Sequence, residues 1–222
     1  MREEKAEKHK QQARGVFITI EGGEGVGKST NIESIREYLQ QKNVESVVTR
    51  EPGGTLIAEK VRKLLLDVHE EQLTELSELL LVFAARAQHI ESLILPALAD
   101  GKWVICDRFT DATYAYQGGG RGLDRTKIAQ LETMVQGQLK PNLTIILDMD
   151  PALGMERAAK RGSLDRFEQE ALEFFDKVRA CYLEIAAREP ERCVIVDASQ
   201  KLVDVKASLF RMLDDRLPQL KL

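Results

Sequence analysis

The amino-acid sequence predicts an α/β fold in which a parallel sheet of five strands is flanked by helices. Short apolar runs rich in β-branched residues recur along the chain, and longer helix-forming stretches separate them. A glycine-rich turn follows the first apolar run and leads directly into an amphipathic helix. With 222 residues, of which 43% are hydrophobic, the chain is long enough for one domain with a sizeable core and too short for two.

The predicted strands are nearly continuous apolar runs, as expected when helices cover both faces of a parallel sheet. They comprise residues 16–20, 44–49, 103–106, 143–147 and 193–196. The helix after the glycine-rich turn repeats Ile32, Ile35 and Leu39 at helical spacing. The other predicted helices comprise residues 56–66, 74–99, 124–137, 151–160, 168–188 and 201–216. No internal repeat or linker interrupts this alternation, so we assign residues 15–222 to a single domain.

The glycine-rich turn matches the phosphate-loop pattern G-x-x-x-x-G-K-[ST] at every fixed position. Its backbone N–H groups and the following helix N-terminus point at one place and favour an anion. Lys28 is expected to reach the β- and γ-phosphates of a nucleoside triphosphate, and Ser29 to ligate Mg²⁺. The predicted nucleotide-binding residues are Gly22, Gly23, Glu24, Gly25, Val26, Gly27, Lys28, Ser29 and Thr30.

Charged residues follow three of the later strands, at Arg50 and Glu51, Asp107 and Arg108, and Asp148 and Asp150. Right-handed crossovers place the carboxyl ends of parallel strands at one edge of the sheet, where ligands bind in this class of fold. Asp107 stands where phosphate-loop proteins hold an acid near the metal ion. Arg50 and Arg108 can each form a two-pronged contact with a phosphate, which predicts a second phosphate site. The alternative is that each arginine pairs with a neighbouring acid, Glu51 or Asp107.

Two glycine-containing segments suggest moving parts. Residues 117–121 hold three consecutive glycines and are expected to form a mobile loop hinge. Residues 157–166 gather Arg157, Arg161 and Arg166 beside a glycine, which predicts a basic lid at about residues 154–168 that closes over a triphosphate. The alternative is an ordinary solvated helix end, since cations are favourable near a helix C-terminus.

Composition and charge argue against several classes of protein. The formal net charge of −4 disfavours a dedicated nucleic-acid binder. The three cysteines form no C-x-x-C pair, so neither a disulfide framework nor a zinc site is expected, and a reducing cytoplasm fits. No apolar run is expected to reach the length of a membrane span. Residues 1–14 are charged and contain no apolar core, which predicts a flexible extension.

Together, these motifs resemble the thymidylate kinase family, the dTMP kinase branch of the P-loop nucleoside monophosphate kinases. The resemblance extends from about Gly15 onward and rests on the phosphate loop and on residues 50–55, 83–86, 107–108, 115–121 and 164–168, which occur in the family's order and spacing. It implies the P-loop nucleoside monophosphate kinase fold. It also implies phosphoryl transfer from ATP, with Mg²⁺, to the small-molecule substrate dTMP, giving dTDP for dTTP synthesis. A homodimer formed through long helices such as residues 74–99 is implied as well.

The resemblance assigns roles to residues of the acceptor site. Glu24 is expected to meet the sugar 3′-hydroxyl of dTMP, and Arg50 and Arg108 its 5′-phosphate. Arg86 is expected to donate to thymine O4, and it would reject cytosine, which presents an amino donor at that place. Tyr116 is expected to leave no room for a ribose 2′-hydroxyl. The remaining substrate-binding residues implied are Pro52, Phe83, Thr113 and Gln117.

The variable positions of the phosphate loop hold no arginine, so the chain resembles family members whose catalytic arginines lie in the lid, a type common in bacteria. The catalytic residues implied are Lys28, Arg108, Arg157 and Arg161, with Ser29 and Asp107 at the metal. Sequence alone does not decide which of Arg157, Arg161 and Arg166 contacts the transferring phosphate.

Two positions depart from the family pattern. In many members the ring stacked on thymine lies four residues before the pocket arginine, where this chain has Val82. Phe83 lies three residues before Arg86, so it either stacks on the base or packs in the core. A serine is usual where this chain has Ala112, so one polar contact is either absent or supplied by Thr113.

Three rival functions are weaker. A kinase for another nucleotide or for a deoxynucleoside is disfavoured by the base-pocket pattern. A P-loop switch or regulatory NTPase has no need for a second phosphate site, and a GTPase switch should carry an Asn-Lys-x-Asp motif late in the chain, which the sequence does not have. A binding module without catalysis is disfavoured by the intact Lys28, Ser29 and Asp107.

Overall fold

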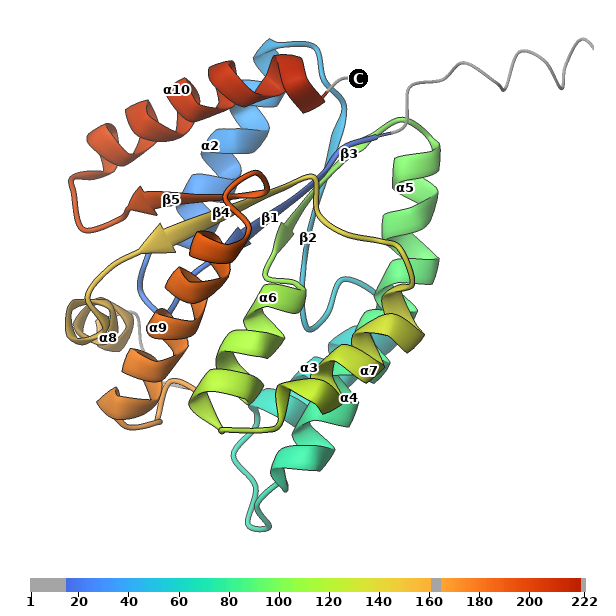
Figure 1. The fold of residues 1–222 in the computed structure, drawn as a ribbon, viewed down its shortest axis with the longest axis vertical. Helices are drawn as coiled ribbons and strands as arrows, with labels where there is room; N and C mark the ends of the chain where they lie inside the picture. Colours follow the sequence, from blue (N-terminus) through green and yellow to red (C-terminus); the bar gives the residue numbers. More distant parts are fainter. Residues whose placement is uncertain (1–14, 161–164, 221–222) are drawn as a thin grey trace, which may run out of the picture.

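The computed structural model describes residues 15–160 and 165–220, and it contains the five predicted strands as one parallel sheet (Figure 1). The strands are β1 (Phe17–Glu21), β2 (Ser46–Arg50), β3 (Trp103–Asp107), β4 (Leu143–Asp148) and β5 (Cys193–Asp197). They lie in the order β2–β3–β1–β4–β5, and every neighbouring pair is parallel. The chain leaves the central β1 toward β2 on one side and later crosses to β4 on the other. The carboxyl end of β1 is therefore the switch point at which this class of fold binds ligands.

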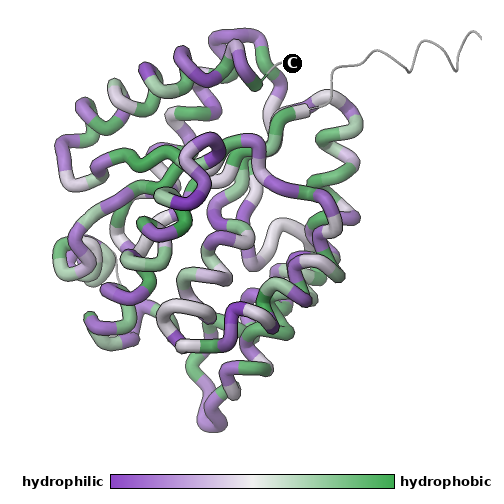
Figure 2. The backbone as a smooth tube through the Cα atoms, viewed as in Figure 1, coloured by the Kyte–Doolittle hydropathy of each residue, from purple (hydrophilic) through white to green (hydrophobic). Residues whose placement is uncertain are grey.

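Two helices cover one face of the sheet. They are α2 (Lys28–Gln41) and α10 (Leu202–Leu220), which lie together in Figure 1. Ile35 of α2 and Leu209 of α10 are fully buried in one core cluster with Ile18 of β1. Figure 2 shows the same arrangement as hydrophobic strands beneath helices whose outer turns are hydrophilic. The periodic apolar positions of these helices thus build the core that the sequence predicted.

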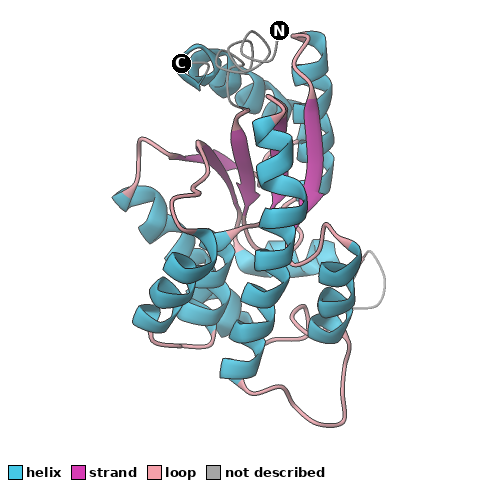
Figure 3. Ribbon diagram, turned by 90° about the vertical axis from the view of Figure 1, so that its right-hand side faces the viewer, coloured by secondary structure: helices cyan, strands magenta, loops and turns pink. Residues whose placement is uncertain are grey.

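The other face is covered by the remaining long helices. They are α4 (Glu75–His89), the π-helix η2 (Ile90–Ile94), α5 (Leu95–Ala99), α7 (Arg125–Gln136) and α9 (Leu172–Arg188), with α3 (Leu56–Leu66) and α8 (Pro151–Ala159) nearer the loops. Side-chain caps from Thr55, Thr74, Asp124 and Asp150 begin four of these helices. Figure 3 shows that the strands lie in one half of the molecule and that the other half consists of helices and the loops that join them.

The continuous helix formed by α4, η2 and α5 is long and apolar enough to cross a membrane, which the sequence analysis did not predict for any segment. By length and composition alone, Glu75–Ala99 could cross a membrane, and 44% of its most apolar window is buried inside the structure. Core helices of folded domains pass the same test. This helix also buries Glu78, Arg86 and His89 against polar partners, which marks it as a core helix of this domain.

Residues 110–120 form a helix where the sequence analysis expected, in part, a mobile loop. The short helix α6 (Thr110–Thr113) continues directly into a π-helix, η3 (Tyr114–Gly120). A Cβ atom on Gly120 would lie 2.3 Å from the ring of Phe174 in α9, and one on Gly119 would lie 3.0 Å from Cβ of Cys181. The glycines therefore allow two helices to approach closely. The hinge prediction is wrong up to Gly120, because this packing outweighs the low helix propensity of glycine.

Candidate active site

A cavity of about 470 Å³ opens at the carboxyl edge of the sheet. Its walls come from the phosphate loop, the ends of β2 and β3, and the helices α3, α4, α6, η3 and α8, together with residues 165–168. Fifteen of the twenty residues assigned to the site from the sequence contribute to these walls. Those that do so are Glu24, Gly25, Gly27, Lys28, Ser29, Thr30, Arg50, Pro52, Arg86, Asp107, Arg108, Thr113, Tyr116, Gln117 and Arg157.

The phosphate loop has the backbone conformation that its glycines permit. Gly22, Gly25 and Gly27 have φ angles of 133°, 69° and 86°, which side chains rarely tolerate. A Cβ on Gly25 would also lie 1.9 Å from the carbonyl oxygen of Gly154 in α8, so the loop packs directly against that helix. Gly22, Gly23 and Val26 line a small cleft behind the loop instead of the main cavity.

Lys28 lies at the start of α2 and curls back over its own loop. Its Nζ donates hydrogen bonds to the carbonyl oxygens of Gly23 at 2.8 Å and Gly22 at 3.3 Å. Burial, with a further contribution from Arg108, lowers the pKa of the Lys28 ammonium. A bound phosphate would offer this ammonium a stronger acceptor than the two carbonyls do.

Glu24, Arg108 and Tyr116 converge although they come from three separate parts of the chain. Arg108 Nη2 donates to Glu24 Oε1 at 2.6 Å and to the Tyr116 hydroxyl at 2.9 Å. The Tyr116 hydroxyl in turn donates to the same Glu24 oxygen at 2.7 Å. The guanidinium also lies 5.3 Å from the centre of the Tyr116 ring. The predicted sugar contact, phosphate ligand and 2′-hydroxyl barrier therefore share one corner of the cavity.

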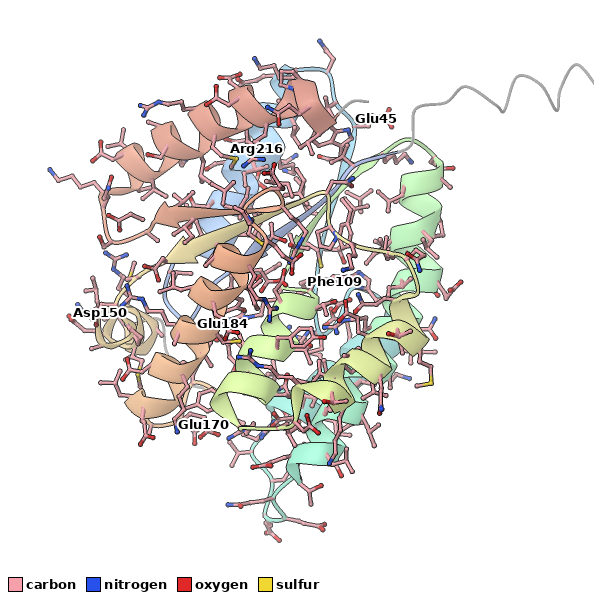
Figure 4. All side chains as sticks on the ribbon, viewed as in Figure 1. Glu45, Phe109, Asp150, Glu170, Glu184 and Arg216 are labelled. Carbon is pink, nitrogen blue, oxygen red and sulfur yellow. The ribbon has the colours of Figure 1, made fainter. Side chains whose placement is uncertain are left out.

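The backbone that presents Arg108 is held in an uncommon conformation. Arg108 has a φ angle of 65°, in the left-handed region that arginine rarely adopts. The next residue, Phe109, donates its N–H to Glu21 Oε1 at 2.7 Å, and Figure 4 labels Phe109 near the centre of the molecule. Glu21 Oε2 accepts from the Tyr182 hydroxyl at 2.8 Å. Burial, and then the neighbouring Asp111, raise the pKa of the Glu21 carboxyl to about 8.

Arginine side chains gather where the ends of β2 and β3 and the helix α3 line the cavity. Arg50 donates to Glu59 of α3, with Nη2 2.9 Å from Oε2, so its acidic partner is not one of the two neighbours considered from the sequence. Arg62 of α3, which the sequence analysis missed, donates from Nη1 to the carbonyl oxygen of Pro52 at 2.8 Å. Burial, Arg50 and Arg108 together lower the pKa of Arg62. So many cations in one place favour an anionic ligand.

A sequence signal for Arg62 does exist. Arg62 lies four residues after Ala58 and three before Leu65, both fully buried on the same face of α3. A cation that interrupts an apolar helical stripe in this way points inward, toward the interior of the protein.

Arg86 of α4 is almost completely buried in the cavity wall, with 1% of its surface exposed. Its Nε donates to Glu51 Oε2 at 2.7 Å, and its Nη2 donates to Thr113 Oγ1 at 2.8 Å and to the Phe109 carbonyl at 3.1 Å. Within the described residues, Arg86 Nη1 is buried without a hydrogen-bond partner. An unpaired donor in a cavity wall is costly unless a ligand accepts from it. Arg86 thus fits a contact to a carbonyl oxygen of the substrate.

The structure separates Val82 from Phe83. Val82 lines the cavity at the position where many family members have a stacking ring. Phe83 is buried in a small core cluster with Leu79 and Ile128, and Arg86 lies over its ring at 4.8 Å. Gln117 lines the cavity and donates from Nε2 to Glu78 Oε1 at 2.8 Å. Phe83 therefore supports Arg86 from behind the wall, in the core position that was the second interpretation from the sequence.

The lid arginines occupy different places. Arg157 of α8 lines the cavity, and its guanidinium donates to the carbonyl oxygens of Ala198 and Ser199 at 3.2 and 3.3 Å. Arg166 is tied to the protein, with Nη2 2.6 Å from Glu78 Oε2 and Nε 2.8 Å from the Leu65 carbonyl. Arg161 lies outside the described residues, as does the predicted extension 1–14.

The residues predicted for the metal lie at the cavity but form no protein cage. Ser29 and Asp107 both line it, and Asp107 Oδ1 is buried without a hydrogen-bond partner, 3.7 Å from Arg108 Nη1. Across residues 15–160 and 165–220, no group of three or more His, Cys, Asp or Glu side chains could hold a metal ion. A carboxylate oxygen without a hydrogen bond and one hydroxyl fit Mg²⁺, which takes few protein ligands and completes its shell with phosphates and water.

The other acids after the strands have structural partners. Asp148 forms a two-pronged ion pair with Arg179 of α9 at 2.7 and 2.9 Å. Asp150 caps α8 by accepting from the N–H groups of Ala152 and Leu153. The acidic residues at the end of β4 and just after it therefore stabilise the fold next to the site.

Comparison with known proteins agrees with this geometry. The family model described as thymidylate kinase matches residues 20–209. A thymidylate kinase from Pseudomonas savastanoi pv. phaseolicola is 57% identical over 206 residues, covering 93% of this chain and 96% of the relative. One from Teredinibacter turnerae is 53% identical over 200 residues, covering 90% and 98%.

A crystal structure supports the same assignment. Thymidylate kinase from Ehrlichia chaffeensis superposes with a TM-score of 0.74 at 37% identity, over 90% of this chain and 99% of that one. The predicted fold class is confirmed by this match and by the five-stranded parallel sheet. The chain belongs to the thymidylate kinase family.

Proposed function

We propose that the cavity binds dTMP beneath a phosphate loop that holds ATP, and that its residues carry out the family's reaction in the roles set out below. That reaction moves the γ-phosphoryl group of ATP to dTMP and forms dTDP. The observation that carries the assignment of roles is the shared cavity. It brings Lys28 of the donor site, the Glu24–Tyr116–Arg108 cluster and the unpaired Nη1 of Arg86 to one space.

The acceptor phosphate would lie among Arg50, Arg62 and Arg108. All three line the cavity, and their mutual repulsion is relieved when a dianionic phosphate enters. Arg108 has a constrained backbone, and its Nη2 is hydrogen-bonded to both Glu24 and Tyr116, so it would fix the direction of the phosphate. Pro52, whose carbonyl holds Arg62, would shape the same end of the site.

The base would lie against Val82 with one edge toward Arg86. Arg86 Nη1 would donate to thymine O4, and the amino group of cytosine would meet this donor with a donor of its own. Thr113 would act through Arg86, to which it is hydrogen-bonded, and so supplies a polar group beside Ala112. Gln117, held by Glu78, would contact the base or its surroundings.

Catalysis would consist of positioning and charge stabilisation without a covalent intermediate. Lys28 would leave its two carbonyl acceptors for the β- and γ-phosphates. Arg157 and Arg161 would stabilise the transferring group from the lid segment. Ser29 and Asp107 would hold Mg²⁺, which when bound neutralises charge on the phosphates.

We also propose that the chain acts as a homodimer in the cytoplasm. Large apolar side chains are exposed on α3 and α4, including Leu56, Ile57, Leu76 and Leu80, and a second copy could cover them. The three cysteines are free and buried, as suits a reducing compartment. Residues 15–222 would form one domain, and residues 1–14 a charged extension.

The experiment that tests the function is a coupled ADP-release assay with Mg-ATP and dTMP, dUMP, dCMP, dGMP or dAMP in parallel. Turnover that strongly favours dTMP is the expected result. Preference for another monophosphate would retain the kinase chemistry and refute the proposed base pocket. Slow ATP hydrolysis with no acceptor dependence would instead indicate a regulatory NTPase.

A further inference from the structure

Behind Arg86 lies a line of buried hydrogen bonds that reaches away from the cavity. Glu51 accepts from Arg86 Nε through Oε2, and its other oxygen, Oε1, lies 2.9 Å from Nδ1 of His89. The far side of the ring continues the line, since His89 Nε2 lies 2.7 Å from Thr49 Oγ1. His89 is 0% exposed and Thr49 is 7% exposed, and neither lines the cavity. The line Thr49–His89–Glu51–Arg86 therefore joins β2 to α4 behind the proposed base pocket.

Each hydrogen bond in this line has a defined donor and acceptor. An ionised Glu51 only accepts, so Nδ1 of His89 must carry the proton that it shares with Oε1. In the neutral ring, Nε2 is then the acceptor for the Thr49 hydroxyl. Each of the two Glu51 oxygens thus receives one donor, and the carboxylate is held from both sides. The turn after Glu51 packs directly against this line, because a Cβ on Gly54 would lie 2.5 Å from both His89 Nε2 and Thr49 Oγ1.

The line determines where the free nitrogen of Arg86 points. A guanidinium is planar, so fixing Nε on Glu51 and Nη2 on Thr113 and Phe109 also fixes the direction of Nη1. If Glu51 could rotate, Nε would lose its partner and the guanidinium could tilt. Among the residues that the structure describes, the side-chain hydrogen bond to Glu51 that does not come from Arg86 comes from His89.

We infer that Glu51 and His89 are positioning residues for base selection, with Thr49 holding the histidine ring. They hold the Arg86 guanidinium in one orientation, so that its unpaired Nη1 donates to a thymine carbonyl and rejects a cytosine amino group. This inference rests on the proposed contact between Arg86 and the base. A role for His89 in core packing alone would contribute to stability and leave substrate choice unchanged.

The test compares two substitutions, each of which keeps the hydrogen bond made by one of the two ring nitrogens of His89. His89→Asn places an amide nitrogen near the position of Nδ1 and keeps the donor to Glu51. His89→Gln places its amide near the position of Nε2, keeps the contact to Thr49 and loses the donor to Glu51. For each variant, kcat and KM are measured with dTMP and dCMP, together with KM for ATP and the melting temperature.

The expected result is a difference between the two variants. His89→Gln should raise KM for dTMP about tenfold and narrow the preference for dTMP over dCMP by a similar factor, while kcat and KM for ATP change less than about twofold. His89→Asn should restore most of the wild-type selectivity. Thr49→Val, which removes the hydroxyl at the far end, should shift selectivity in the same direction by a smaller factor and serves as the test if His89→Gln does not fold.

Other outcomes separate the inference from the function on which it rests. Equal losses of melting temperature in both histidine variants, with unchanged selectivity, would overturn the positioning role. Arg86→Lys keeps the charge and loses the planar fork, so it tests the base contact itself. If Arg86→Lys changes selectivity and the His89 and Thr49 variants do not, only the positioning role fails. If Arg86→Lys leaves selectivity unchanged, the proposed base contact fails as well.

Discussion

The buried pair of Arg86 and Glu51 leads to a prediction about stability that follows from its environment. The two side chains are 1% and 3% exposed, and Nε lies 2.7 Å from Oε2. Arg86→Leu would leave the Glu51 carboxylate buried with His89 as its remaining partner in this line. Breaking a buried pair from one side costs about 3–5 kcal/mol of the free energy of unfolding. That is a large share of the roughly 5–15 kcal/mol typical of a domain.

The double variant Arg86→Leu/Glu51→Leu removes both charges together. The desolvation penalty of the isolated carboxylate is then absent, and what remains is the loss of partners for His89, Thr113 and the Phe109 carbonyl. Each such loss costs about 1–3 kcal/mol at most, and replacing both partners by apolar groups is often close to neutral. We therefore expect the double variant to be more stable than Arg86→Leu alone.

The assay measures the free energy of unfolding by urea denaturation, monitored by far-ultraviolet circular dichroism. It is applied to the wild type, both single variants and the double variant. Unchanged m-values would show that the free energies can be compared. The exposed pair of Glu156 in α8 and Lys160 at its C-terminal end provides the matched control, and a cycle there should show no measurable coupling. If the effects of Arg86→Leu and Glu51→Leu simply add, within about 0.5 kcal/mol, the argument from the buried pair is refuted.

Three further predictions concern the site. Lys28→Ala should lose most turnover while its urea midpoint stays near that of the wild type, and a fully active variant would rule out the phosphate-loop role. Arg62→Leu should raise KM for dTMP about tenfold with KM for ATP unchanged, since it removes one charge-assisted phosphate contact; an unchanged dTMP KM would take Arg62 out of the acceptor site. Glu21 has a pKa of about 8 in the folded state against an ordinary value of 4.5, so the folded state keeps a proton that the unfolded chain releases. Stability should therefore fall between about pH 5 and pH 8, by at most about 1.4 kcal/mol per pH unit, and Glu21→Gln should flatten this slope; parallel pH profiles would contradict it.

Consecutive residues were the part of the site that could be predicted from the sequence. The phosphate loop lies within residues 22–29, and a strand and a helix flank it directly, so local pattern defines both its shape and its place. Arg50, Asp107 and Arg108 were also predicted, because parallel strands bring their carboxyl ends to one edge in any fold of this class. The five strands could be located as well, because each is a local apolar run that is visible in the sequence without knowledge of the strand order.

Pairings between distant residues could not be predicted in this way. Arg50 pairs with Glu59, and Arg166 with Glu78, because helices packed at set angles bring those acids into reach. The helix at residues 110–120 was missed because its glycines have low helix propensity and are favoured only by close contact with α9. A propensity describes the isolated chain, whereas that contact exists only after folding.

The sequence by itself determined that this chain binds a nucleoside triphosphate, that its sheet is parallel, and where along the chain the ligand-facing ends of the strands occur. These follow from backbone chemistry and hydrophobic periodicity, which act over a few neighbouring residues. Only the tertiary structure decided that Arg86 in the cavity wall keeps one nitrogen buried without a partner, that Val82 and not Phe83 lines the wall, and that Thr49, His89 and Glu51 lie behind the arginine. Those facts depend on contacts among buried side chains of β2, α4 and α6. These contacts form only when the helices pack on the sheet.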